Sequence, residues 1–176
     1  MKKNSDVVRL SDANSRIVRI CQQLLEADVM DKSELDNGKV PKERGIYLWR
    51  HKEDESAAYY VGVALGERGL KGRIIGQHLR PSYEQSVFRK AIVKYSGVNS
   101  RDESVDYIKK HFTLALAACP DQEPAVILAA EALLIAALRP KFNNIKGLMA
   151  DIQGTEAPGE PRHGLPGHYY FFQQKR

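Results

Sequence analysis

Glu131 is the most conspicuous polar residue of this sequence, because every other residue from Ala125 to Leu138 is apolar. A carboxylate in such a segment is costly unless a cation or a bound metal stabilises its charge, or its pKa is raised. The structural alternative is a glutamate at the edge of the apolar face, paired with a cation or facing solvent. The segment alone leaves both explanations open.

Other polar residues also call for an explanation beyond packing. Each has an ordinary structural one: strand tyrosines pack in cores, a helix arginine is solvated, a histidine near a helix end caps it, and an asparagine after a helix forms a turn. These types can nevertheless also transfer protons and bind anions. The candidates are Tyr47, Tyr60, Arg73, His78 and Asn143.

A hairpin is predicted to position the two tyrosines. Strands at 45–50 and 57–63 flank the charged turn 51–56. If the turn is centred between Glu53 and Asp54, Tyr47 lies directly opposite Tyr60, on one face of the sheet. On the other face we expect Ile46, Leu48, Tyr59 and Val61. A one-residue slip in register would separate the two tyrosines.

Helical periodicity and breaker residues predict the remaining elements. Residues 1–10 are expected to be a loose lead-in, and 31–44 a connecting loop. Gly72 and Gly76 lie on one helix face, which suggests a close approach by backbone or ligand. The predicted helices are 11–25, 70–79, 84–95, 102–110 and 124–138, and the third strand is 111–117.

The composition is that of an ordinary folded domain, with a formal net charge of +5 that leans towards polyanionic partners. Cys21 and Cys119 form no metal motif and are expected to be reduced core thiols. We see no signal peptide and no transmembrane span, so we expect a cytoplasmic protein without a membrane partner. After residue 144 the chain is rich in glycine and proline. Its aromatic end, 169–172, could pack as a strand or tail, stack on bases or contact a subunit.

Two short motifs carry a resemblance to a known family. Gly45-Ile46-Tyr47, Tyr60-Val61-Gly62 and the helix residue Arg73 resemble the GIY-YIG nucleases. The second half agrees: that family has a segment E-x-x-L-I-x-x-x-x-P-x-[YF]-N, and this chain has Glu131, Leu134, Ile135, Pro140, Phe142 and Asn143 at the same spacing.

The chain departs from the family pattern in two places. The histidine or tyrosine often found four residues after the helix arginine is Gln77 here, and His78 follows one residue later. His78 reaches the site if the helix is distorted near Gly76; otherwise the site does without it. Val63 stands where the family often has lysine or serine.

The resemblance implies an α/β fold of the α+β type, a small antiparallel three-stranded sheet flanked by helices. The chain would then comprise a helical N-terminal extension and loop (1–44), the nuclease domain (45–144) and a C-terminal extension (145–176).

The resemblance also implies a metal-dependent endonuclease that hydrolyses DNA, with Mg²⁺ (or Mn²⁺) held by Glu131. Arg73 would bind phosphate, Tyr47 would be the general base and Tyr60 would position water or phosphate. His78 could accept the proton of Tyr47, and Asn143 would hold the site together. Candidate contacts to the nucleic-acid backbone are Lys71, Arg89, Lys90, Lys94 and Lys141.

Several functions remain open at this point. A stand-alone restriction-like or defence enzyme is favoured over a repair subunit. The alternatives are a nuclease for RNA, single-stranded or branched substrates, and a nucleic-acid-binding module that has lost hydrolysis. Cutting both strands of a palindrome would favour a homodimer, although one site per chain can also act by successive nicks.

Overall fold

The computed structural model describes residues 2–143 and has the predicted mixed α+β fold. Its centre is an antiparallel three-stranded sheet of β1 (Gly45–His51), β2 (Asp54–Ala64) and β3 (Phe112–Ala118). The strand order is β2-β1-β3, so the strand that carries Tyr47 is the middle one. The chain divides into two compact units, Met1–Phe142 and Asn143–Arg176, and the predicted aromatic end lies outside the described residues.

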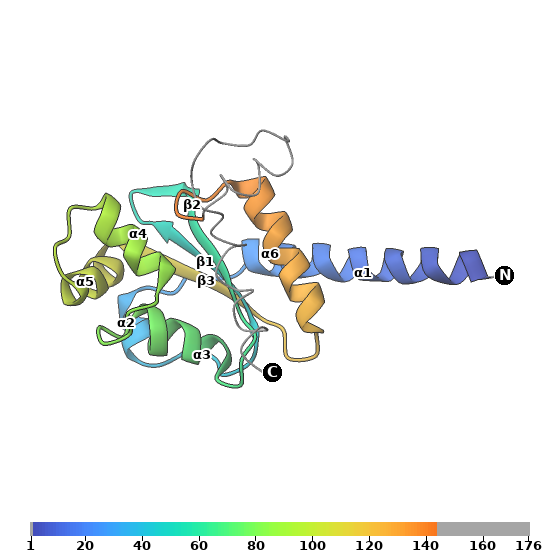
Figure 1. The fold of residues 1–176 in the computed structure, drawn as a ribbon, viewed down its shortest axis with the longest axis horizontal. Coiled ribbons are helices and arrows are strands. Elements are labelled where there is room, and N and C mark those ends of the chain that lie inside the picture. Colours follow the sequence, from blue (N-terminus) through green and yellow to red (C-terminus); the bar gives the residue numbers. More distant parts are fainter. Residues whose placement is uncertain (1, 144–176) are drawn as a thin grey trace, which may run out of the picture. The chain divides into compact units, whose positions relative to one another are not determined.

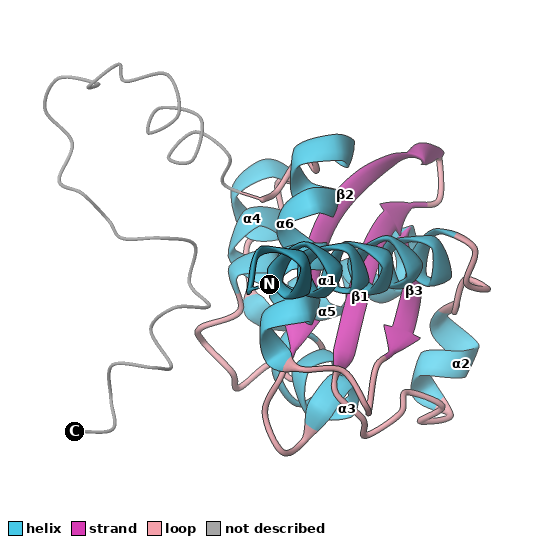
Figure 2. Cartoon of the chain, turned by 90° about the vertical axis from the view of Figure 1, so that its right-hand side faces the viewer, coloured by secondary structure: helices cyan, strands magenta, loops and turns pink. Residues whose placement is uncertain are grey.

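Helices cover both faces of this sheet (Figures 1 and 2). One face carries α1 (Lys2–Leu25) and α6 (Pro124–Leu138). The opposite face carries α3 (Gly69–Arg73), the π-helix η1 (Ile74–His78), α4 (Val87–Tyr95) and α5 (Arg101–His111). A short helix, α2 (Lys32–Asp36), lies between α1 and β1. None of the described helices is long and apolar enough to cross a membrane.

The two faces of the sheet build separate hydrophobic cores, because successive strand side chains point to opposite sides. Ile46 and Leu48 of β1 pack with α1 and α6, and this core also holds both cysteines as free, buried thiols. Tyr47 and Trp49 belong to the other core, together with Tyr60. The apolar run of α6 therefore supports the sheet from the side opposite the tyrosines.

The register of the hairpin differs from the prediction. Tyr47 lies opposite Gly62, and Tyr60 lies opposite Trp49, because irregularities near the turn shift the pairing. Tyr59 is the extra residue, since Trp49 pairs with Tyr60 while the next residue, Arg50, already pairs with Ala58. The shift moves Tyr59 into the core on the tyrosine face, and the expectation that it faces α6 is wrong. Tyr47 and Tyr60 still share a face, because their pairing moved by an even number of residues.

Three other local predictions need correction. The expected lead-in at 1–10 is helical from Lys2, and the first turns expose Val7, Val8 and Leu10. The expected loop 31–44 contains α2, which is capped by the side chain of Asp31. The helix expected from residue 84 begins only at Val87, because Ser86 accepts a hydrogen bond from the backbone of Arg89 and acts as its N-cap.

Candidate active site

Tyr47 and Tyr60 form the base of the candidate site. Their ring centroids are 6.2 Å apart, and neither side chain is more than 2% exposed. Gly62, which lies opposite Tyr47, leaves the space that the phenol occupies: a Cβ atom there would lie 2.4 Å from the Tyr47 hydroxyl. Gly45 is constrained similarly, since its Cβ would lie 2.2 Å from the carbonyl oxygen of Ala117. The glycines of both motifs thus have a packing reason.

His78 reaches the tyrosines because the helix that carries it changes from α to π. After Arg73 the chain forms η1, and the backbone N–H of Leu79 donates to the carbonyl of Ile74, five residues back, at 2.9 Å. A π-turn accommodates one residue more than an α-turn. His78 is therefore fully buried, and its Nε2 lies 2.7 Å from the Tyr47 hydroxyl oxygen. The one-residue displacement of His78 in the sequence is compensated here.

Gly72 and Gly76 differ in what surrounds them. A Cβ at Gly72 would lie 2.2 Å from the Cβ of Arg68, one turn earlier on the same helix. A Cβ at Gly76 would meet nothing within 4 Å. The expected close approach is therefore present at Gly72, where it comes from a side chain. At Gly76 no atom of the described residues comes close.

Ser86 extends the hydrogen-bonded chain to a third residue. Its hydroxyl oxygen lies 2.7 Å from His78 Nδ1 and accepts from the backbone N–H of Arg89 at 3.2 Å. With the imidazole hydrogen on Nδ1 donated to Ser86, Nε2 accepts the hydrogen bond of the Tyr47 hydroxyl. Sequence reasoning missed Ser86. Its signal was a serine directly before the apolar pair Val87-Phe88, which is typical of a helix N-cap.

Arg73 contacts the Tyr47 hydroxyl from the other side. Its Nε donates to the Tyr47 oxygen at 3.3 Å, and one terminal nitrogen donates to the side-chain oxygen of Gln77. The guanidinium is half-buried. Tyr47 thus lies between a fixed cation and an imidazole, which partly offset the effect of burial on the loss of its proton.

The pKa values of these groups show that they act on one another. Burial raises the pKa of Tyr47, although the charge and hydrogen bond of Arg73 lower it. Burial, with the neighbouring Tyr47, also raises the pKa of Tyr60. Burial lowers the pKa of Arg73, but the two tyrosines raise it more, so the guanidinium stays charged.

Glu131 belongs to the same electrostatic cluster. It is 6% exposed, and burial raises its pKa to about 7, while the charge of Arg73 acts in the opposite direction. Its own charge raises the pKa of both tyrosines. Glu131 is therefore neither at the solvent edge nor remote from the tyrosines.

The donor set fits a hard cation that keeps most of its water. Within residues 2–143 no group of three or more histidine, cysteine, aspartate or glutamate side chains could enclose a metal ion. A single buried carboxylate, with water and substrate oxygens as further ligands, is a setting in which Mg²⁺ is commonly held. The raised pKa of Glu131 means that a cation would compete with a proton for this carboxylate.

The segment after α6 returns to the edge of β2. The backbone N–H groups of Lys141 and Phe142 donate to the carbonyls of Ala58 and Tyr59, at 3.2 and 2.8 Å. Asn143 is half-buried and is the first residue of the second unit. Its part in the site remains a prediction.

The candidate nucleic-acid contacts have different surroundings. Arg89 was expected to face outward, but it is 3% exposed and its guanidinium donates to the carbonyl of Arg80, so that expectation is wrong. The helix begins at Val87 rather than at residue 84, and Arg89 lies in its first turn, turned inward. Lys90, Lys94 and Lys141 are exposed and Lys71 is half-buried.

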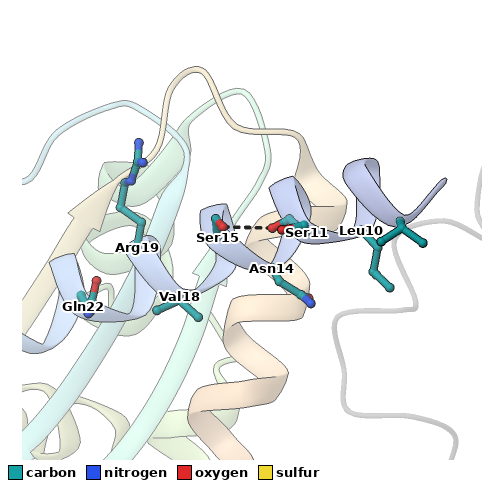
Figure 3. Close-up of a pocket in the computed structure, with 8 residues that line it drawn as sticks. Leu10, Ser11, Asn14, Ser15, Val18, Arg19 and Gln22 are labelled. Carbon is teal, nitrogen blue, oxygen red and sulfur yellow. Dashed lines mark hydrogen bonds between the residues drawn. The ribbon is translucent and has the colours of Figure 1, made fainter. Parts of the chain in front are cut away.

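A hollow of about 630 Å³ runs along α1 (Figure 3), and none of the candidate site or nucleic-acid contact residues lines it. Its lining consists of side chains of that helix, among them Leu10, Asn14 and Val18. Its lining includes Val7 and Leu10, which the first turns of α1 expose, and it has no titratable cluster comparable to that around Tyr47. We assign it no chemistry.

Comparisons with known protein families, with curated proteins and with solved structures found no match to this chain. The functional argument therefore rests on the residues and geometry described above.

Proposed function

We propose that this protein is a metal-dependent endonuclease that hydrolyses phosphodiester bonds of DNA, with a site of the GIY-YIG type. The observation that carries the proposal is the hydrogen-bonded series Arg73, Tyr47, His78 and Ser86, which lies within electrostatic reach of Glu131. In this series the guanidinium of Arg73 can bind phosphate, Tyr47 can accept a proton from water, and the imidazole of His78 can take up the proton that Tyr47 releases.

Tyr47 acts as the base for the attacking water through His78. A neutral phenol is a poor base near pH 7, and burial makes its ionisation harder. In the proposed step the water gives a proton to the Tyr47 oxygen while Tyr47 passes its own proton to Nε2 of His78. The products of the transfer are hydroxide at the phosphorus, neutral Tyr47 and a protonated imidazole. Ser86 holds the imidazole by accepting its Nδ1 hydrogen.

Arg73 has two roles in this proposal. It neutralises the charge that builds on the phosphate oxygens, because a guanidinium offers fixed donors and remains charged. It also covers the Tyr47 hydroxyl in this structure, since Tyr47 is 0% exposed and accepts from Arg73 Nε. A phosphate that draws the guanidinium away from Tyr47 would give water access to the base.

Glu131 would hold the divalent cation. The apolar residues of α6 fix the position of this carboxylate, and burial raises its pKa to about 7. A bound Mg²⁺ or Mn²⁺ supplies Lewis-acid stabilisation of the scissile phosphate and the leaving oxygen. Tyr60, beside Tyr47 on the same face, positions the water or a phosphate oxygen.

Cleavage of supercoiled plasmid tests the proposal. We expect nicked and linear products with Mg²⁺ or Mn²⁺, and none with EDTA. Glu131→Gln keeps the shape of the side chain but removes the carboxylate, and it should lower the rate by at least about a hundredfold, the typical scale of loss for a catalytic group. Glu123→Gln is the matched control, because it makes the same change at an exposed position beside the start of α6.

Two results would refute the proposal. One is wild-type protein that leaves plasmid, single-stranded DNA and branched DNA intact with both metals. The other is a Glu131→Gln variant that cuts as fast as Glu123→Gln. Sequencing the ends of the cleaved DNA then shows whether cleavage occurs at discrete sites.

A further inference from the structure

A second hollow, of about 400 Å³, opens on the same face of the sheet as Tyr47, near the hairpin end of β1 and β2. This volume lies within the range of about 300–1,000 Å³ that is common for ligand pockets. Aromatic side chains from five separate parts of the chain line it: Tyr59, Tyr95, Tyr107, Phe112 and Phe142. We call it the aromatic pocket.

The walls of the aromatic pocket are only partly covered. Phe112, in β3, is 1% exposed and forms the buried side, where Tyr59 meets it edge to face at 5.4 Å. Tyr95, in the last turn of α4, is 63% exposed, with its ring nearly parallel to that of Phe142 at a centroid distance of 5.7 Å. A large ring exposed to this extent gains little from the fold, and it offers a face on which a planar ligand can stack.

Cations lie over two of these rings. The Lys141 ammonium is 4.2 Å from the ring centroid of Tyr59, donates to its hydroxyl at 2.7 Å and pairs with Asp54 at 3.0 Å. The Lys94 ammonium is 5.0 Å from the ring centroid of Tyr95. Aromatic faces flanked by lysines suit a ligand that joins a planar base to a phosphate.

A single ring, that of the fully buried Phe88, packs between the aromatic pocket and the candidate active site. Phe88 of α4 lies 5.2 Å from Tyr60 and 6.2 Å from Phe142, centroid to centroid. Phe88 also lies 5.8 Å from His78. The aromatic pocket and the candidate active site therefore share one aromatic cluster on the same face of the sheet.

We propose that the aromatic pocket binds an unpaired nucleobase of the strand that lies in the active site. This rests on the proposed function, which it sharpens: the substrate is single-stranded DNA, or DNA in which a nucleotide near the cleaved bond is unpaired or turned out of the helix. Bases within a duplex have both faces stacked on neighbours, so only an unpaired base can stack on Tyr95 or Tyr59.

Binding without metal tests this inference separately from cleavage. The full chain is titrated in EDTA into a fluorescein-labelled single-stranded oligodeoxynucleotide, and into the blunt duplex of the same sequence, with anisotropy as the readout. We expect tighter binding of the single strand. Tyr95→Ala should weaken that binding at least about fivefold, the lower end for loss of one base–aromatic stack.

Two variants on the same helix are controls. Tyr95→Phe keeps the ring and should bind like wild type. Val93→Ala changes an α4 side chain that is 38% exposed and outside the pocket lining, and it should also be neutral. Urea unfolding of each variant shows whether a loss of binding reflects a loss of folding.

The outcomes separate this inference from the proposed function. Tyr95-dependent binding by a protein that cuts no DNA refutes the nuclease and supports the pocket. A protein that cuts plasmid, while Tyr95→Ala matches wild type in single-strand binding, overturns the pocket and keeps the nuclease. Preference for the blunt duplex, or loss of binding in Tyr95→Phe equal to that in Tyr95→Ala, also overturns it.

Discussion

Replacing Glu131 by glutamine should change how the stability of the protein depends on pH. Burial raises the pKa of this carboxyl from its ordinary value of 4.5 to about 7 in the folded protein. The folded protein therefore keeps its proton over a pH range in which the unfolded chain has already released it. The corresponding stabilisation is fully present below pH 4.5 and is lost as the pH rises through 7.

The size of the effect follows from the two pKa values. At about 1.4 kcal/mol for each pH unit between them, the difference corresponds to roughly 3 kcal/mol. Glutamine resembles the protonated side chain and does not titrate. The Glu131→Gln variant should match wild type near pH 4.5 and exceed its free energy of unfolding by roughly 3 kcal/mol at pH 8.

Urea unfolding in EDTA at several pH values between 4.5 and 8.5 measures this difference, with Glu123→Gln as the control for the same change at an exposed carboxyl. Other titrating groups affect wild type and variant alike, so only the difference between their curves matters. At pH 8, adding Mg²⁺ at about a hundred times its dissociation constant should stabilise wild type by about 2.7 kcal/mol and leave Glu131→Gln unchanged. Parallel stability curves would refute the assignment of a buried, proton-binding carboxyl.

Three further changes test the positioning of the site. Deleting Gly76 removes one residue from the π-turn, so a continuous α-helix should still bring His78 to Tyr47. The rate of plasmid cleavage should then stay within about tenfold of the wild-type rate. Complete loss of cleavage in a folded protein would contradict the role given to the π-turn. Gly62→Ala places a Cβ 2.4 Å from the Tyr47 hydroxyl. Urea unfolding should show that the free energy of unfolding falls by about 1–3 kcal/mol, and cleavage should be lost. A variant with unchanged stability and cleavage would show that this contact has no consequence. Arg139 has a left-handed backbone conformation (φ 48°) at the end of α6, which glycine adopts without strain. Arg139→Gly should therefore raise the free energy of unfolding by about 1 kcal/mol, measured by thermal unfolding. A lower melting temperature would show that the arginine side chain stabilises the turn.

Much of the fold follows from local patterns in the sequence. The first and third strands and the apolar helix around Glu131 are predicted close to their observed bounds, because periodicity marks them and prolines flank the helix. The second strand begins at Asp54, inside the predicted turn 51–56, so the turn is shorter than expected. The conspicuous carboxylate is in fact buried. The segment alone left a position at the solvent edge open, and the burial of Glu131 decides against that alternative.

The errors arise where tertiary contacts decide. The irregularities between Trp49 and His51 set the hairpin register. Their position is not specified by the sequence of the turn. Tyr59 faces the tyrosine side for the same reason. Arg89 has the composition of a surface residue, but a carbonyl of another segment, at Arg80, accepts its hydrogen bond.

The sequence predicts a link between Tyr47 and His78 only on the condition that the helix is distorted near Gly76, and it does not indicate the contact with Ser86. The condition could not be decided from the sequence, because the pattern around Gly76 does not reveal the π-turn. A serine before a helix is ordinarily a cap, and Ser86 serves as one while also contacting the imidazole. Only the three-dimensional structure shows that one hydroxyl does both.

The rate of plasmid cleavage by Tyr47→Phe compared with wild type tests the central claim most directly. The substitution removes one hydroxyl from a fully buried ring and keeps its shape, so the fold and the DNA-binding surface should be retained. Measured under single-turnover conditions with Mg²⁺ or Mn²⁺, the rate should fall by at least about a hundredfold while single-strand binding is unchanged. A folded Tyr47→Phe protein that cuts DNA as fast as wild type would contradict the account.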